Sequence, residues 1–284
     1  MLAASIIWGL AFSAQSTAMR HIPPITFVFL RSAITCLVLA AAAPLFARLS
    51  GSHGEETPPL SVHIRRGVPI GAFLMAATLL QQVGLVYTTP AKSGFVTALY
   101  IVMVPLLGLL FHRPVGRLVW VGVALSLTGL VLLCVREDMS VNIGDLFTLG
   151  SALMFSCQIM LVAKHAPGLD AVKLSAVQFG TCAVLAGLLA LIMETPTLSG
   201  VVAGLPSLIY VAVMSGAVGY TLQIVGQKST DPTLASLLMC LESVFAAIGG
   251  WILLHQALSP RELIGCALML AASVVAQLPD RRRA

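Results

Sequence analysis

The stretch LQQVGLVYTTP at residues 80–90 recurs as LQIVGQKSTDP at residues 222–232. The two copies share leucine, glutamine, valine, glycine, threonine and proline at equivalent places. Three further matches keep the same order in both halves of the chain and nearly the same spacing between copies. They pair Phe12–Gln15 with Phe155–Gln158, Thr35–Ala40 with Thr181–Ala186, and Gly122–Leu125 with Gly265–Leu268. Four collinear matches at a near-constant spacing predict that the chain contains two copies of one unit.

The composition excludes a water-soluble protein. Of the 284 residues, 58% are hydrophobic and 10% are charged, and the mean hydropathy is +0.98. Soluble domains carry about 25% charged residues. The same composition excludes a disordered chain and a nucleic-acid-binding protein. All six cysteines lie in apolar runs, which predicts buried thiols rather than disulfides or metal ligands.

Ten apolar runs are long enough to cross a membrane, for which about 20 residues are needed. These runs must be helices, because lipid offers the backbone no hydrogen-bond partners. We therefore predict an all-α integral membrane protein with ten transmembrane helices. The predicted spans are Met1–Met19, Ile25–Phe46, Gly67–Val86, Ala91–Phe111, Leu118–Val135, Asp145–Ala163, Val172–Met193, Leu205–Val225, Leu234–Leu254 and Glu262–Leu278. The longest connection, Ala47–Arg66, is predicted to be a solvated loop.

Each copy of the repeated unit contains five predicted spans. Because five is an odd number, the second copy must enter the membrane from the opposite face, which predicts an inverted-topology repeat. The predicted units are residues 1–135 and 145–278, with a connecting loop at 136–144 and a basic tail at 279–284. Such symmetry is typical of alternating access. A duplication that serves packing alone is the other interpretation.

The basic residues predict the orientation in the membrane. Ten spans put both termini on one side, which carries eleven Lys and Arg residues against four on the other side. The positive-inside rule then places both termini in the cytoplasm. The tail Arg281–Arg283 is expected to lie against anionic headgroups, or to bind a partner. The eleven are Arg48, Arg65, Arg66, Arg113, Arg117, Lys164, Lys173, Lys228 and Arg281–Arg283, and the four are Arg20, Lys92, Arg136 and Arg261.

Short motifs in both halves resemble a known family. Trp8-Gly9, Pro23-Pro24 and Phe29-Leu30-Arg31 resemble the opening pattern of EamA-type transporters of the drug/metabolite transporter superfamily. The run from Leu241 to Ala247 resembles that family's Glu-Pro-Val-Phe signature, with Ser243 in place of the proline. His255-Gln256 stands where the family has a second glutamate. The resemblance implies transport of metabolites, usually export, across the bacterial inner membrane.

Two charged residues lie well inside predicted spans, where a charge costs about 2.5–3.5 kcal/mol. Glu242 lies about 12 Å from the cytoplasmic end of its span at 1.5 Å per residue. It can exchange a proton for substrate or bind an amine, or it can form a hydrogen bond that serves helix packing. Arg31 lies about 9 Å from the outer boundary by the same rise. It can bind a substrate carboxylate, or extend to the interface.

Four glutamines form two pairs of equivalent residues in the repeat, Gln15 with Gln158 and Gln81 with Gln223. Amides both donate and accept hydrogen bonds, which suits a neutral or zwitterionic solute. We predict that these glutamines line a cavity, with bonding between helices as the alternative. Tyr100, the equivalent of Glu242, and Tyr220 are further candidates for the same cavity.

These features predict a secondary transporter for a small polar or amino-acid-like solute, with Glu242 as the candidate for proton coupling. The chain has no nucleotide-binding loop, so ATP is not expected to drive transport, and no enzyme motif or metal-ligand spacing is present. We expect no cofactor, a lipid bilayer as partner and, as one option, a homodimer. A membrane scaffold without transport is the rival hypothesis, and it predicts glutamines in dry helix contacts.

Overall fold

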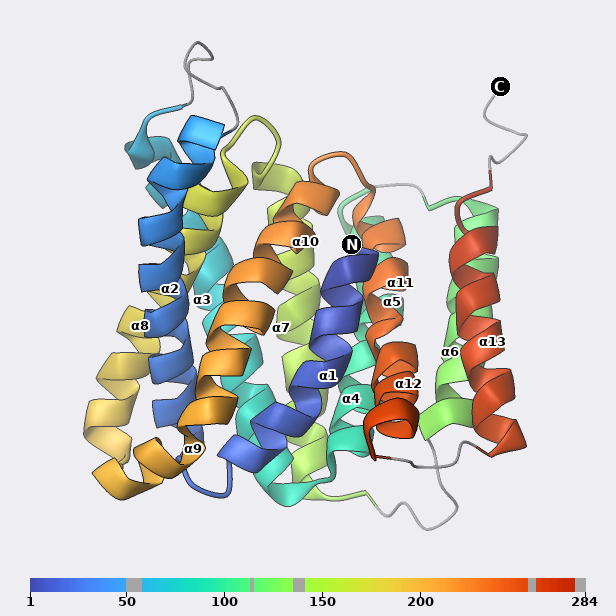
Figure 1. The fold of residues 1–284 in the computed structure, drawn as a ribbon. Coiled ribbons are helices and arrows are strands. Elements are labelled where there is room, and N and C mark those ends of the chain that lie inside the picture. The colour runs from blue at the N-terminus through green and yellow to red at the C-terminus, as the bar shows by residue number, and fades with distance from the viewer. Residues whose placement is uncertain (50–57, 113–114, 135–140, 255–258, 279–284) are drawn as a thin grey trace.

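The computed structural model describes residues 1–49, 58–112, 115–134, 141–254 and 259–278, and these residues form helices and short connections without strands (Figure 1). The predicted all-α class is therefore confirmed. Arg113, Arg136, His255, Gln256 and the tail 279–284 lie outside the described residues, as does the beginning of the predicted loop 136–144. The elements are α1 (Leu2–Ala18), α2 (Pro24–Leu49), α3 (Leu60–Tyr87), α4 (Pro90–Ala98), α5 (Tyr100–Leu110), α6 (Arg117–Cys134), α7 (Ile143–His165), α8 (Ala171–Met193), α9 (Leu198–Tyr210), the π-helix η1 (Val211–Gly219), α10 (Tyr220–Gln227), α11 (Pro232–Cys240), α12 (Glu242–Leu254) and α13 (Pro260–Val275).

The repeated Thr-x-Pro stretch marks the start of two equivalent helices. The side chain of Thr89 caps α4 by accepting a hydrogen bond from the Lys92 amide, and Asp231 caps α11 by accepting one from the Thr233 amide. Pro90 and Pro232 each follow the cap at the first helical position, where a proline loses no hydrogen bond. The repeat at residues 80–90 and 222–232 is therefore the end of one helix, a short turn and the start of the next helix, used twice.

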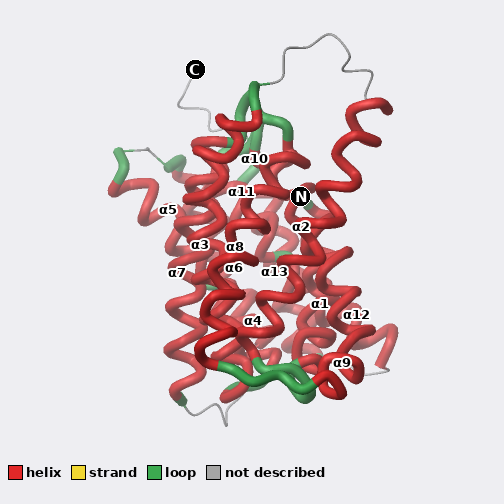
Figure 2. The backbone as a smooth tube through the Cα atoms, turned by 90° about the vertical axis from the view of Figure 1, so that its left-hand side faces the viewer, coloured by secondary structure: helices red, strands yellow, loops and turns green. Residues whose placement is uncertain are grey.

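Seven described helical segments are long and apolar enough to cross a membrane. They are Pro24–Pro44, Leu60–Tyr87, Lys92–Leu110, Arg117–Cys134, Ile143–His165, Ala171–Met193 and Leu198–Gln227. Leu2–Ala18 and Pro232–Ile248 are shorter apolar helical segments, and α13 has 16 residues. The helices lie side by side, with the loops gathered at the two ends of the bundle (Figure 2).

The predicted helix ends were wrong in two places. Ala47–Arg66 is not a loop throughout, since α2 extends to Leu49 and α3 begins at Leu60. The eighth predicted span, Leu205–Val225, begins earlier, at Leu198, where Thr197 caps the helix. Hydropathy marks where a chain leaves the hydrocarbon, whereas helical hydrogen bonding continues into the polar region until a cap or a proline ends it.

Two predicted spans are interrupted, which the sequence did not indicate. Leu99 separates α4 from α5, and Leu241 separates α11 from α12. At both places the amide bonds a carbonyl three residues back, Leu99 to Val96 and Leu241 to Leu238, as in a tighter turn. The two interruptions occupy equivalent places in the repeat, because the register that pairs Gln81 with Gln223 also pairs Leu99 with Leu241.

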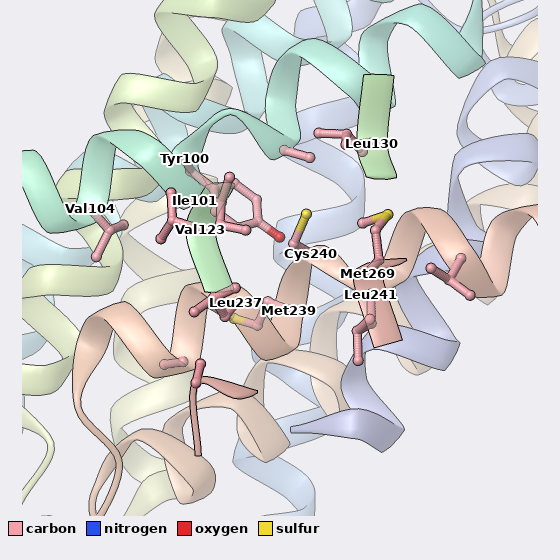
Figure 3. Close-up of a cluster of buried hydrophobic side chains, with 14 of the residues drawn as sticks. Tyr100, Ile101, Val104, Val123, Leu130, Leu237, Met239, Cys240, Leu241 and Met269 are labelled. Carbon is pink, nitrogen blue, oxygen red and sulfur yellow. The ribbon is translucent and has the colours of Figure 1, made fainter. Parts of the chain in front are cut away.

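The two halves of the chain interleave instead of forming separate lobes. Helix α2 packs against α8, α3 against α7 and α8, α6 against α13, and α1 against α12 and η1. A buried cluster joins α5, α6, α11 and α13, and it includes Tyr100, Val123, Leu237 and Met269 (Figure 3). Apolar packing therefore holds both halves together around the middle of the bundle.

Helices α6 and α13 approach closely through glycines. A Cβ atom added at Gly129 would lie 2.6 Å from the carbonyl oxygen of Gly265, and one at Gly265 would lie 2.6 Å from the carbonyl oxygen of Gly129. Small residues allow such close crossings in membranes, where van der Waals contact drives association.

We expect Gly129→Ala to lower the free energy of unfolding by about 1–3 kcal/mol, the usual cost of overpacking. The reason is that backbone atoms of α13 cannot move aside, so the two helices must separate. Thermal unfolding in detergent measures the effect. Gly108→Ala is the matched control, because an added Cβ there meets nothing within 4 Å. Equal stability of the two variants would contradict the close crossing.

Candidate functional site

A cavity of about 50 Å³ lies between helices of both halves. This volume holds a few water molecules, since one water needs roughly 10–15 Å³. All eight residues that the sequence singled out lie on its wall, so the structure brings the whole predicted set together. They are Gln15, Arg31, Gln81, Tyr100, Gln158, Tyr220, Gln223 and Glu242.

Gln15 is the centre of the first-half polar network. Its side-chain oxygen accepts a hydrogen bond from a guanidinium nitrogen of Arg31 at 3.2 Å. The same oxygen accepts a second bond from the amide nitrogen of Gln82. Arg31 is 2% exposed. The network therefore ties α1 to α2 and α3, and it holds Arg31 inside the bundle instead of at the interface.

Gln158, the equivalent of Gln15, is the centre of a second network. Its amide nitrogen donates to the side-chain oxygen of Gln178 at 3.4 Å. Its oxygen accepts a hydrogen bond from the amide nitrogen of Gln223 at 3.2 Å. This network ties α7 to α8 and α10. Each half therefore has one glutamine that bridges three helices beside the cavity.

Glu242 is the first residue of α12, directly after the interruption at Leu241. One carboxylate oxygen accepts a hydrogen bond from the Tyr100 hydroxyl at 3.4 Å, a long distance for such a bond. Helix α1 crosses close by, because a Cβ atom added at Gly9 would lie 2.6 Å from the Glu242 carbonyl oxygen. Gly9, part of the Trp8-Gly9 motif, therefore lets α1 lie against the backbone that carries the carboxyl group.

Arg31 and Glu242 do not pair with each other. Lys92 forms an ion pair with Asp145 at 2.6 Å, away from both of these groups. The cavity therefore holds a guanidinium group and a carboxyl group, each without an opposite charge in contact. Amides, hydroxyls and these two groups equip it to bind a polar solute through hydrogen bonds and charge.

A π-helical segment, η1, supplies another wall of the cavity. The Thr35 hydroxyl lies 2.7 Å from the carbonyl oxygen of Ala212, and the Trp8 indole nitrogen donates to the carbonyl oxygen of Ser215 at 3.2 Å. These contacts bring hydrogen-bond donors from neighbouring helices to the irregular backbone, although Thr35 shares its one proton with the Arg31 carbonyl oxygen, which is also 2.7 Å away. Tyr220, at the end of η1, packs against Trp8 with ring centroids 4.9 Å apart. Short π-helical segments are frequent at functional sites.

Comparison with known proteins identifies the family. The pattern of the EamA-like transporter family matches residues 1–135 and 142–277. The chain belongs to this family. An uncharacterized transporter from Archaeoglobus fulgidus is 26% identical over 275 residues, which cover 96% of this chain and 83% of the relative. A solved crystal structure with 20% identity matches the fold with a TM-score of 0.78, over 99% of this chain and 96% of its own.

Membership confirms the resemblance seen in the sequence, and it makes this EamA-like transporter a multi-pass membrane protein. Sequence reasoning nevertheless missed several residues at the cavity. Thr97, which accepts a hydrogen bond from Gln81 at 3.1 Å, and Ser215 line its wall. Gln82 and Gln178 are fully buried behind it, and each keeps one polar atom without a partner. Both residues could have been recognised in the sequence as amides inside apolar runs. Neither, however, has a glutamine at the equivalent place in the other half.

We expect Thr35→Val to destabilise this EamA-like transporter by about 1–3 kcal/mol, the cost of a buried acceptor left unsatisfied. The change keeps the shape of the side chain but removes the hydroxyl that contacts Ala212 in η1. Thermal unfolding in detergent is the measurement. Thr17→Val is the control, because Thr17 is exposed and contacts its own helix. Equal melting temperatures for Thr35→Val and Thr17→Val would mean that the hydroxyl does not support the π-helix.

Proposed function

We propose that this protein is a secondary transporter that moves a small polar metabolite or an amino-acid-like solute, in the direction of export, by alternating access. One observation carries the proposal: the polar and aromatic residues that line the cavity come from both halves of an otherwise apolar bundle. A scaffold without transport would bury its glutamines in dry contacts between helices. A polar cavity argues against that alternative.

Alternating access rests on an inverted repeat of five plus five helices. Helix α1 runs downwards in Figure 1 while its equivalent α7 runs upwards. The packing supports the same symmetry, because the equivalent helices α2 and α8 touch each other, as do α6 and α13. In the repeat, α1 is equivalent to α7, and η1 belongs to the segment that is equivalent to α3. The contact of α3 with α7 therefore corresponds to the contact of α1 with η1. The contacts between these equivalent helices therefore fit a pseudo-two-fold axis in the membrane plane.

The small cavity indicates how the solute would move. Sites for drug-sized molecules have volumes of roughly 300–1,000 Å³. The cavity in this structure, at about 50 Å³, is much smaller. A solute would therefore need the two halves to shift apart at one face or the other. The interruptions at Leu99 and Leu241 lie beside the cavity and offer places for such movement.

A gradient would supply the driving force, with Glu242 as the coupling group. Glu242 is 6% exposed, lines the cavity and has a hydrogen bond from Tyr100. A carboxyl group in this place can take up a proton from one side and release it to the other as the cavity changes its opening. The protein would act in the inner membrane with both termini in the cytoplasm, as the distribution of basic residues favours.

The proposed topology predicts which loops a membrane-impermeant maleimide can label in intact cells. In a variant that lacks the native cysteines, we expect Thr195→Cys and Ser259→Cys to react from outside, because both lie in proposed external loops. Pro167→Cys and Ser229→Cys lie in proposed cytoplasmic loops and should react only after permeabilisation. All four residues are exposed. External labelling of Pro167→Cys would contradict the proposed orientation, with both termini in the cytoplasm.

We expect Glu242→Gln to abolish the response of transport to an imposed pH gradient, because an amide cannot carry the proton. Proteoliposomes loaded with a mixture of small polar metabolites, with efflux followed by mass spectrometry, provide the measurement. Glu262→Gln is the matched control, since Glu262 caps α13 and glutamine serves equally in a capping box. If Glu242→Gln keeps both its rate and its pH dependence, Glu242 is not the coupling group.

A further inference from the structure

Arg31 is a buried cation without a counter-ion. Its guanidinium group donates to Gln15 at 3.2 Å and contacts Tyr220, and both partners are uncharged. Among the described residues no acidic side chain forms an ion pair with it. An isolated charge in an apolar bundle is costly, and charges kept there generally face a cavity or a partner. Arg31 lines the cavity, so an anionic group bound in the cavity would compensate its charge.

The charge of Arg31 breaks the symmetry between the two halves. The register that relates Thr35 to Thr181 places Val177 opposite Arg31, with the neutral amide Gln178 beside it. The second-half network of Gln158, Gln178 and Gln223 also joins three helices through one glutamine, but it has no cation. Packing needs alone would be met by a neutral amide at both places. Packing therefore does not explain why a charged guanidinium group is present at this position.

We propose that Arg31, Gln15 and Tyr220 form a carboxylate subsite in the cavity, so that the transported solute carries a carboxylate group. This inference rests on the proposed transport function and names its class of substrate. The planar guanidinium fork matches the two oxygens of a carboxylate, which it can bind with two parallel hydrogen bonds. A single cation also suits a singly charged group better than a doubly charged phosphate.

The neighbouring groups complete the hydrogen bonding of such a carboxylate. The oxygen of Gln15 is already used by Arg31 and Gln82. Its NH₂ group, which has no hydrogen bond to another described residue, is therefore available as a donor. The Tyr220 hydroxyl, beside Arg31, is a second donor. A carboxylate has about four lone-pair sites, and the guanidinium, the amide and the hydroxyl together can fill them.

Binding measured separately from transport tests the subsite. Trp8 lines the cavity, so its fluorescence in the purified protein can report the binding of a solute, with Trp8→Phe as the check on the signal. The probes are 2-aminobutyrate, butyrate and succinate, the amide 2-aminobutyramide, and 1-aminopropane, which lacks the carboxylate. The variants are Arg31→Gln and Arg31→Lys. Arg65→Gln, which removes the same charge from an exposed part of α3, is the matched control.

We expect the wild type and Arg65→Gln to bind at least one carboxylate probe about tenfold or more tightly than the amide and the amine, the factor that a charge-assisted hydrogen bond supports. Arg31→Gln should lose this preference, and Arg31→Lys should keep part of it.

Three outcomes would overturn the subsite. They are equal binding of carboxylate and amide by the wild type, a failure of every carboxylate probe to bind saturably, and an unchanged preference in Arg31→Gln. Carboxylate binding that depends on Arg31, without transport in proteoliposomes, would support the subsite and refute the transport function. Transport of the probes in proteoliposomes without any preference for carboxylates would support the transport function and refute the subsite.

Discussion

The absence of hydrogen-bond partners in hydrocarbon is the constraint on which this structure depends. A polar side chain inside an apolar bundle must find its partners on neighbouring helices or at a cavity. Gln15 and Gln158 satisfy this requirement in the two halves, each by bonding to side chains from two other helices. The groups that make the cavity polar are therefore also the groups that hold its walls together, so the proposed solute binding and the packing of the helices use the same amides.

The same constraint explains where the backbone becomes irregular. The interruptions at Leu99 and Leu241 come directly before Tyr100 and Glu242, and η1 ends directly before Tyr220. All three following residues line the cavity. Irregular backbone is tolerated within a membrane only where other protein groups or a cavity satisfy it, and Thr35 and Trp8 do so for η1. Departures from the regular helix are therefore concentrated where side chains must reach the centre.

The sequence predicted the site better than it predicted the course of the helices. Gln15, Gln81, Gln158 and Gln223 were recognisable because each is a polar residue in an apolar run with an equivalent in the other half. Gln178 has no such equivalent, and whether it faces Gln158 or lipid depends on helix rotation, which an almost uniformly apolar run does not reveal. The interruption at Leu99 was also invisible, because neither glycine nor proline occupies that position. The early start of α3 was missed because hydropathy measures burial in lipid and not helical hydrogen bonding.

The two halves differ in chemistry, and the difference matters for the proposed inverted symmetry. If the halves were identical, exchanging their conformations would turn an opening at one face into an opening at the other at no cost in energy. Here the ion pair of Lys92 and Asp145 joins α4 to α7. The repeat registers that pair Gln81 with Gln223 and Gln15 with Gln158 place Leu234 and Leu2 at the equivalent positions. An ion pair at one membrane face and two leucines at the other do not stabilise the closed arrangement of the two faces equally. Under the proposed alternating access, the states that open to opposite sides would therefore differ in energy, and a solute or proton that binds one state more tightly would shift their populations.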